Sequence, residues 1–291
     1  MPNLKEGFID VPGGKVFYQI FGADKKGTPL LTLHGGPGAP HYMLLSLSSL
    51  ADERPVIFYD QLGCGKSDHP NDKSLWTVER FIEELDIVKR SLGYKEYHIL
   101  GASWGTMLAA SYMIVKKPLD VKSLIFSGPF LSIPMWDADQ REYIQQLPPE
   151  TRDFIVDCEA REDYSNEQYQ NAVTVYYKKH LCRLDPWPDD LNRTLSEMGT
   201  DVYLTMWGPS EFTDTGTLKG KDVTPRLKEI NVPVLIMCGE HDEATPKTSL
   251  YYKGMFKNAE LAVINNASHA HLLERPDVCS LIISDFLHRK G

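Results

Sequence analysis

Short apolar runs alternate with helical patterns along most of this 291-residue chain, and this alternation is the feature that most restricts its fold. The runs lie at residues 30–33, 56–59, 97–100, 121–126, 234–238 and 261–264. Most are apolar on both faces, as strands are when helices cover both sides of a sheet. Residues 77–92 repeat apolar side chains at three- and four-residue intervals, which indicates an amphipathic helix ending at Gly93. Strands that alternate with helices predict βαβ units and a mostly parallel sheet.

The two ends of the chain extend this pattern. Residues 7–11 and 16–21 are β-rich and flank Pro12-Gly13-Gly14, so they predict a hairpin. Residues 277–288 predict a closing helix.

The pattern breaks between about Pro129 and Gly216, where the sequence becomes helical, polar and rich in acidic residues. Strand candidates resume after this stretch, so an insertion between two strands explains it better than a separate terminal domain. We therefore expect a helical cap at residues 129–216 over the carboxyl edge of the sheet. The core would be formed by residues 1–128 and 217–291.

Composition excludes several classes of protein. A chain that is 42% hydrophobic and 24% charged is ordinarily globular. Its 31 basic and 40 acidic residues give a net charge of −9, which argues against nucleic acid or an anionic membrane as a partner. Five scattered cysteines without a Cys-x-x-Cys pair favour a reducing compartment. With no signal-peptide pattern and no membrane-spanning run, we expect a cytoplasmic protein.

The strongest local motif is Gly-Ala-Ser-Trp-Gly at residues 101–105, between the predicted strand at 97–100 and a helical run at 106–115. A nucleophile elbow needs this context, because its serine occupies a strained strand-to-helix turn whose neighbours must be small. An isolated Gly-x-Ser-x-Gly match is common and can be a structural turn. With the strand and the helix in place, Ser103 is the candidate nucleophile.

A nucleophilic serine needs backbone N–H groups aimed at the oxyanion of its tetrahedral intermediate. His-Gly-Gly-Pro-Gly at residues 34–38 follows a predicted strand, and its glycines permit a sharp turn with N–H groups directed into a cleft. The N–H groups of Gly36 and Trp104 are therefore expected to form the oxyanion hole.

The acid and the base should follow the serine in that order. The acidic loop at residues 239–246 supplies Asp242, and the next loop supplies His269, with His271 as a competitor. We prefer His269 because it lies closer to the end of its strand. It would accept the Ser103 proton and return it to the leaving group, while Asp242 would hold the imidazole tautomer and stabilise its cation.

Two other patterns do not support a cofactor. Gly65-Lys66-Ser67 resembles the end of a phosphate-binding loop, but the required earlier glycine is Asp60 here. His269 and His271 resemble a metal pair, yet no His-Glu-x-x-His motif or cysteine cluster accompanies them. We expect neither a nucleotide nor a metal.

These motifs, together with Asp-Gln-x-Gly-x-Gly-x-Ser at residues 60–67 and Gly-Glu-His-Asp-Glu at 239–243, occur in the order seen in prolyl aminopeptidases. Along nearly its full length the chain resembles the proline iminopeptidase family of α/β-hydrolases, including the tricorn-interacting aminopeptidase. His-Gly-Gly-Pro-Gly followed by the motif at 60–67 is the most specific part of the resemblance. It implies a mostly parallel, eight-stranded sheet with an inserted helical cap.

The resemblance also covers the expected cap. Trp-Gly-Pro-Ser-Glu-Phe at residues 207–212 resembles the segment whose glutamate binds the free α-amino group of the substrate, and Glu243 matches a second such glutamate. Glu211 and Glu243 would thus pair with an ammonium group and reject blocked peptides. Ala102 and Ser268 replace glycines common in the family, which keeps the elbow feasible and leaves the strictness of a proline preference open.

The resemblance implies a serine aminopeptidase that releases an N-terminal residue, preferentially proline, from short peptides, arylamides or amides through an acyl-enzyme. An esterase, a lactonase or an amino-acid amidase is the alternative on the same scaffold, because the fold and triad do not determine the substrate. A non-catalytic binding protein is a third hypothesis, although such proteins usually lack a triad residue. The sequence does not indicate the oligomeric state.

Overall fold

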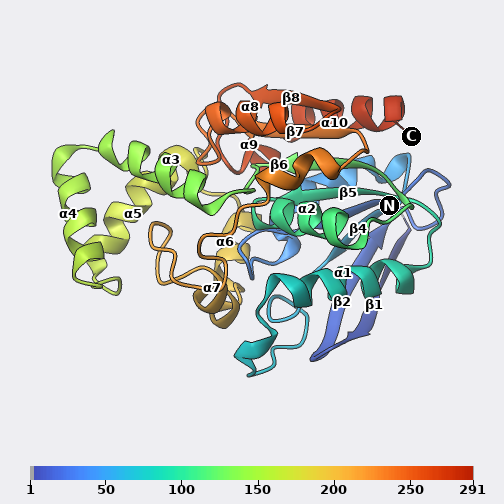
Figure 1. Ribbon diagram of the computed structural model, residues 1–291, viewed down its shortest axis with the longest axis horizontal. Helices are drawn as coiled ribbons and strands as arrows, with labels where there is room; N and C mark the ends of the chain where they lie inside the picture. Colours follow the sequence, from blue (N-terminus) through green and yellow to red (C-terminus); the bar gives the residue numbers. More distant parts are fainter. Residues whose placement is uncertain (1–2, 291) are drawn as a thin grey trace.

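The structure, a computed structural model, describes residues 3–290 and contains one eight-stranded sheet with helices packed on it (Figure 1). The strands are β1 (Leu4–Val11), β2 (Gly14–Phe21), β3 (Leu30–Leu33), β4 (Val56–Tyr59), β5 (Tyr97–Ala102), β6 (Val121–Ser127), β7 (Val234–Gly239) and β8 (Ala259–Ile264). Their order is β1-β2-β4-β3-β5-β6-β7-β8; β2 pairs antiparallel with β1 and β4, and the other neighbours are parallel. The predicted α/β class and mostly parallel, eight-stranded sheet are confirmed.

Two hydrophobic clusters cover the two faces of the sheet. The first includes side chains of α1 (Val78–Leu92), α2 (Trp104–Lys116), α8 (Pro246–Met255) and the 3-10 helix η3 (Thr224–Glu229). The second includes side chains of the 3-10 helix η1 (His41–Asp52), α9 (His271–Glu274) and α10 (Pro276–Lys290). Burial on both faces accounts for the continuous apolar runs of the central strands.

The ends of α1 illustrate how local sequence sets the elements. The Thr77 side chain accepts a hydrogen bond from the Arg80 N–H at 3.3 Å, which caps the start of the helix. After Leu92 the chain turns at Gly93 with a φ of 75°, a left-handed conformation that glycine adopts without a steric penalty. A short 3-10 helix, η2 (Lys73–Leu75), precedes this cap.

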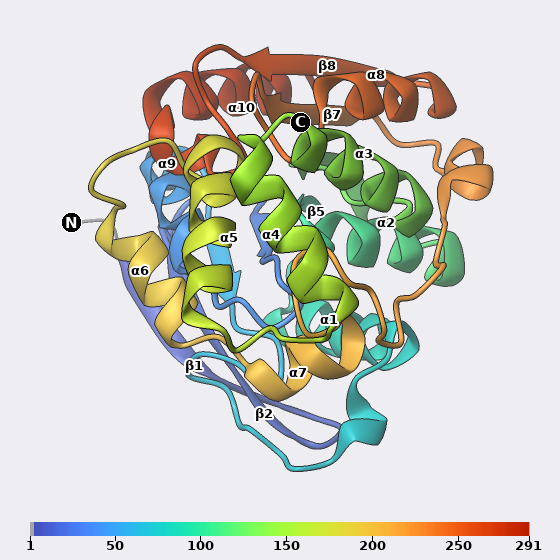
Figure 2. The same ribbon diagram turned by 90° about the vertical axis from the view of Figure 1, so that its left-hand side faces the viewer.

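Five helices lie between β6 and β7, inside the range expected for the cap. They are α3 (Ile133–Gln145), α4 (Pro149–Ala160), α5 (Glu167–His180), α6 (Asp189–Ser196) and α7 (Thr200–Met206). Figure 1 shows them at one end of the sheet, and Figure 2 views the molecule from that end. They carry a small hydrophobic cluster of their own that includes Ile155, Cys158, Tyr169 and Tyr176. The domain boundaries at 128/129 and 216/217 stay a prediction.

One further finding concerns membranes. Within residues 3–290, no helix combines the length and the apolar composition needed to cross one.

Candidate active site

Ser103 lies at a strained turn between β5 and α2. Its φ of 50° and ψ of −121° are unusual for a residue with a Cβ atom. A Cβ atom at Gly101 would collide with the backbone of Gly105, and one at Gly105 would collide with the backbone of β3. The glycines of the motif are therefore required for the close approach of three backbone segments.

A cavity of about 270 Å³ lies between the loops at the end of the sheet and the cap helices. The predicted residues Gly36, Ser103, Glu211, Glu243 and His269 all line it. Two other predicted residues, Asp242 and Trp104, are fully buried behind these. The structure thus brings residues that precede the cap in the sequence, residues that follow it and one residue of the cap itself to one cavity.

His269 is held by Asp242. Its Nδ1 atom lies 2.7 Å from Asp242 Oδ1, and the Asp242 carboxylate also accepts the N–H groups of Gly239 at 3.0 Å and Ala244 at 2.8 Å. Burial alone would raise the pKa of Asp242, but His269 and His271 outweigh burial and hold the pKa well below its usual range. The aspartate is therefore charged and oriented toward the imidazole.

The competing histidine, His271, does not line the cavity. It is fully buried, its Nε2 atom lies 2.8 Å from Ser127 Oγ, and its Nδ1 atom lies 3.2 Å from the Ser268 carbonyl oxygen. These contacts place it beneath the loop that presents His269.

His269 Nε2 faces the cavity, 3.6 Å from Glu243 Oε1. Of the hydrogen bonds among residues 3–290, none joins this nitrogen to Ser103 Oγ; such contacts often form only with substrate bound. Burial disfavours the imidazolium, but the nearby carboxylates, Asp242 and Glu243 foremost, outweigh burial and raise the pKa of His269 to about 9. In the free protein this histidine is therefore stabilised as a cation.

The candidate oxyanion hole has two free donors. Within the described residues, neither the N–H of Gly36 nor that of Trp104 donates a backbone hydrogen bond. Gln61 lies behind them: its Oε1 accepts the Trp104 Nε1–H at 2.9 Å, and its Nε2 donates to the His34 carbonyl oxygen at 3.2 Å. One buried side chain thus ties the elbow to the glycine-rich loop after β3. Gln61 belongs to the motif at residues 60–67, but the motif alone does not indicate this role.

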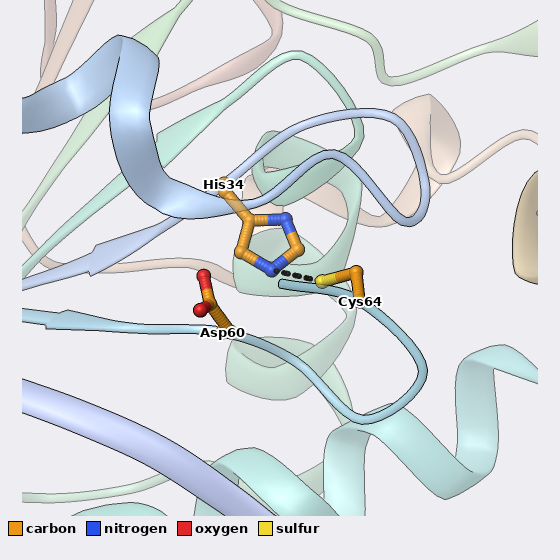
Figure 3. A group of neighbouring side chains, drawn as sticks. All are labelled: His34, Asp60 and Cys64. Atoms are coloured by element: carbon orange, nitrogen blue, oxygen red, sulfur yellow. Dashed lines mark hydrogen bonds between the residues drawn. The ribbon is translucent and has the colours of Figure 1, made fainter. Parts of the chain in front are cut away.

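A buried group of metal-ligating residue types, His34, Asp60 and Cys64, lies behind the glycine-rich loop (Figure 3). His34 Nε2 accepts the Gln61 N–H at 2.8 Å, and the Cys64 thiol donates to the Gln61 carbonyl oxygen at 3.2 Å. Burial lowers the pKa of His34 to about 4 and raises that of Cys64, so both are neutral. Asp60 accepts from His41 Nδ1 at 2.7 Å. Because these ligand atoms already have partners, we assign the group to loop support.

The cap and core each contribute one carboxylate to the cavity, half-buried at Glu211 and buried at Glu243. Glu211 Oε2 accepts hydrogen bonds from the hydroxyls of Tyr177 at 3.2 Å and Tyr203 at 3.3 Å. Glu243 is 4% exposed, and its Oε2 has no partner among the described residues. Burial raises the pKa of both carboxyls, and the nearby His269 cation opposes this effect and favours their charged forms. The pair therefore favours a cationic ligand that would replace lost solvation.

The end of α5 contacts both loops that carry these residues. The carbonyl oxygen of His180 accepts the N–H groups of His269 at 2.9 Å and Glu243 at 3.4 Å. The next carbonyl, of Leu181, accepts the Ala270 N–H at 2.7 Å. The sequence offered no signal for these contacts, because every residue carries a backbone carbonyl.

The parallel sheet, the serine elbow and the histidine–aspartate pair define an α/β hydrolase. In agreement, residues 28–276 match the family described as alpha/beta hydrolase fold. The chain is 46% identical to a proline iminopeptidase of Heyndrickxia coagulans, with 97% of this chain and 98% of the relative covered. The chain therefore belongs to the proline iminopeptidase family.

Solved structures agree over the whole chain. A proline iminopeptidase of Mycobacterium smegmatis has a TM-score of 0.90 at 34% identity, with 98% of each chain covered. The structure of a protein named VinJ has a TM-score of 0.95 at 33% identity, with 100% of each chain covered. The similarity therefore includes the cap as well as the core.

Proposed function

We propose that the protein is a serine aminopeptidase that releases an N-terminal residue, preferentially proline, from short peptides, arylamides or amides. The observation that carries this proposal is the buried carboxylate of Glu243, whose Oε2 has no hydrogen-bond partner among residues 3–290, in the same cavity as Glu211, Ser103 and His269. Such a pair recognises a free ammonium group next to the bond that the serine attacks. The names of the similar relatives, proline iminopeptidases, support the choice of proline.

In the proposed reaction, Ser103 Oγ attacks the carbonyl carbon of the first residue while His269 Nε2 accepts its proton. Asp242 stabilises the resulting imidazolium, and the N–H groups of Gly36 and Trp104 stabilise the oxyanion. His269 then gives the proton to the leaving amine, and an acyl-enzyme remains. A water molecule, activated by the same histidine, hydrolyses the ester and frees Ser103.

Binding of the substrate ammonium also prepares the base. In the free protein, Glu243 stabilises the protonated form of His269 across 3.6 Å. A substrate cation that pairs with Glu243 and Glu211 removes part of this stabilisation and lowers the pKa of His269. The histidine then becomes neutral, which the transfer of a proton from Ser103 requires.

The aromatic side chains near the glutamates suit a compact apolar ring. Phe130 packs edge-to-face against Trp136 at 4.9 Å and against Trp207 at 5.5 Å between ring centroids, and all three line the cavity. The methylene groups of a pyrrolidine ring would pack against these aromatic side chains, and its cationic nitrogen would face the glutamates. We also propose that the helices of residues 129–216 act as a lid that admits small substrates and excludes water during acylation.

The five cysteines are free thiols and all are buried. This supports the proposal of a reducing, cytoplasmic location.

The test is a kinetic panel of proline, alanine, leucine and phenylalanine arylamides, each with a free and an acetylated amino group. We expect proline arylamide to be cleaved best, and its acetylated form at least about 100-fold less efficiently, since a buried carboxylate would lose its partner. Glu211→Gln should lower kcat/KM for free substrates and narrow this ratio. Glu240→Gln is the control, at an exposed glutamate of the loop that carries Glu243, because glutamine keeps an oxygen that can accept the Asn266 N–H.

Equal cleavage of free and acetylated substrates would overturn ammonium recognition. It would favour an esterase, a lactonase or an amidase instead.

A further inference from the structure

Beyond the glutamate pair, the cavity has a second end of different chemistry. It is lined by side chains of η1, of α6 and of the segments next to them: Met43, Leu44, Leu191, Leu195, Met198 and Leu272. Glu211 and Glu243 are the only carboxylates among the cavity-lining residues of the described chain, and no lysine or arginine lines it. One end of the cavity is therefore acidic and aromatic. The other is uncharged and mainly aliphatic, and its one threonine, Thr194 of α6, donates its hydroxyl to the Asp190 carbonyl oxygen at 2.8 Å.

We propose that the aliphatic end is a leaving-group subsite that binds an apolar second residue of the peptide, or an apolar amine. This inference rests on the proposed aminopeptidase function and adds the chemistry of the group that is released. Within residues 3–290 no cationic side chain lines this subsite, so a carboxylate on the second residue finds no partner there. An amide or a longer peptide is therefore a better substrate than a free dipeptide.

The substituents of the attacked carbonyl carbon place the leaving group at this end. Glu211 and Glu243 hold the ammonium, and the oxyanion occupies the hole at Gly36, so the leaving nitrogen must point away from both. It must also lie near His269, which protonates it.

The chain that follows His269 leads directly into the aliphatic wall. Ala270 belongs to one buried cluster with Leu191 of α6, and Met43 of η1 packs against this cluster. Leu272 belongs to a second cluster with Leu44 of η1. Figure 2 shows α6 and α3 on opposite sides of α5, and α3 carries Trp136 of the aromatic group. The general acid thus lies between the two ends.

The aliphatic wall is preformed, because α6 is held on η1 by polar contacts on its outer side. Tyr42 donates its hydroxyl to Glu197 Oε2 at 2.5 Å. The Arg193 guanidinium lies 3.8 Å from the centroid of the Tyr42 ring, and its Nε donates to Glu197 Oε1 at 2.9 Å. A rigid apolar wall binds an apolar group without the cost of ordering itself.

The wall is closed at its inner end and open at its outer end. Leu191 is fully buried, whereas Leu195, one turn further along α6, is 42% exposed. A peptide longer than two residues can therefore leave the cavity past Leu195. This rim position also permits substitution without damage to a buried core.

The test measures released proline from a series of amides, Pro-Leu-NH2, Pro-Phe-NH2, Pro-Gly-NH2 and Pro-Asp-NH2, and from the free dipeptide Pro-Leu. We expect kcat/KM for the leucine and phenylalanine amides to exceed that for the glycine amide by about tenfold, the scale of discrimination by small differences in apolar contact. The aspartate amide and the free dipeptide should be the poorest substrates.

Leu195→Ser should reduce the leucine-over-glycine ratio by about threefold, because part of the apolar contact is lost. Leu195→Asp should reduce it further. Leu204→Ser is the matched control, since Leu204 is a 47% exposed leucine of α7 that does not line the cavity. It should leave the ratio unchanged.

Equal kcat/KM for all four amides, or a ratio that Leu195→Asp does not change, would overturn the subsite while proline release continues. Failure to release proline from any of these substrates would instead overturn the proposed function itself.

Discussion

The two walls of the cavity are built in different ways. The wall from the sheet consists of short loops whose backbone is tightly constrained, as at Ser103 with its positive φ and at Gly101 and Gly105 with their close backbone neighbours. The wall from the cap consists of side chains on helices that have only a small hydrophobic cluster of their own. In the proposed mechanism the first wall carries the triad and the oxyanion hole, whereas the choice of substrate is made by the second wall together with Glu243 and η1 of the core. Substitutions at the triad and the oxyanion hole should change kcat, and those in the cap should change binding.

The largest effect is expected at the nucleophile. Ser103→Ala should lower kcat for proline arylamide by about 10³-fold or more, because removal of a triad serine leaves only binding and the oxyanion hole. Labelling by a fluorophosphonate should also disappear. Ser132→Ala is the control, since it removes a buried hydroxyl that has no hydrogen-bond partner in the described part of the chain. Residual activity within about tenfold of wild type would contradict the role of Ser103.

Gln61→Leu should lower kcat by about 10- to 100-fold and leave KM nearly unchanged, because the donors of the oxyanion hole lose their support. Gln19→Leu is a matched control, as Gln19 is another buried glutamine, bonded to His41 at 2.8 Å and absent from the cavity lining. Both variants should lose stability. If Gln61→Leu lowers stability but leaves kcat at the wild-type value, Gln61 has only a structural role and does not support the oxyanion hole.

The third prediction concerns pH. His269 acts as a base only when it is neutral. Its raised pKa of about 9 therefore shifts the rise of activity with pH toward higher pH. Glu243→Gln removes an anion 3.6 Å away and should lower this pKa, which shifts the midpoint of the fluorophosphonate labelling rate toward lower pH. This reagent carries no ammonium group, so it reports the free protein. A midpoint equal to that of Glu240→Gln and wild type would contradict the electrostatic role of Glu243.

The smallest effect on activity is expected from substitutions in the small hydrophobic cluster of the cap. Ile155→Ala, at a fully buried residue of α4, should lower the free energy of unfolding by about 2–4 kcal/mol. It should raise KM a few-fold and leave kcat and fluorophosphonate labelling close to wild type. Val156→Ala, at the next residue, which is half-exposed, should change neither the free energy of unfolding nor KM. A fall in kcat as large as the rise in KM would show that the two walls are not separable.

The same division explains what could be predicted from the sequence. The loops of the core can be recognised from their residue types. Only glycine fits where backbones approach closely, and only a few residue types can act as nucleophile, base or acid. The apolar run at residues 97–100 predicts the strand that precedes the elbow, and the structure extends it to Ala102.

The sequence patterns of the cap and of η1 are less specific. Tyr177 and Tyr203 bond to Glu211, but any apolar side chain would have satisfied the same helical pattern. The 3-10 helix η1 lacks the 3.6-residue period on which helix prediction depends, so it was not predicted. The position of Gln61 in a motif was visible, whereas its link to Trp104 required the folded chain.

The carbonyl groups at the end of α5 have a consequence for protein engineering. Because His180 accepts hydrogen bonds from His269 and Glu243, the cap is part of the support of the loops it covers. Deletion of the cap would therefore leave these loops without anchors instead of producing a minimal, unspecific hydrolase. A chimaera with a foreign cap should keep residues 180–182. The other cap segments can then be replaced while the loops of Glu243 and His269 keep their backbone hydrogen bonds.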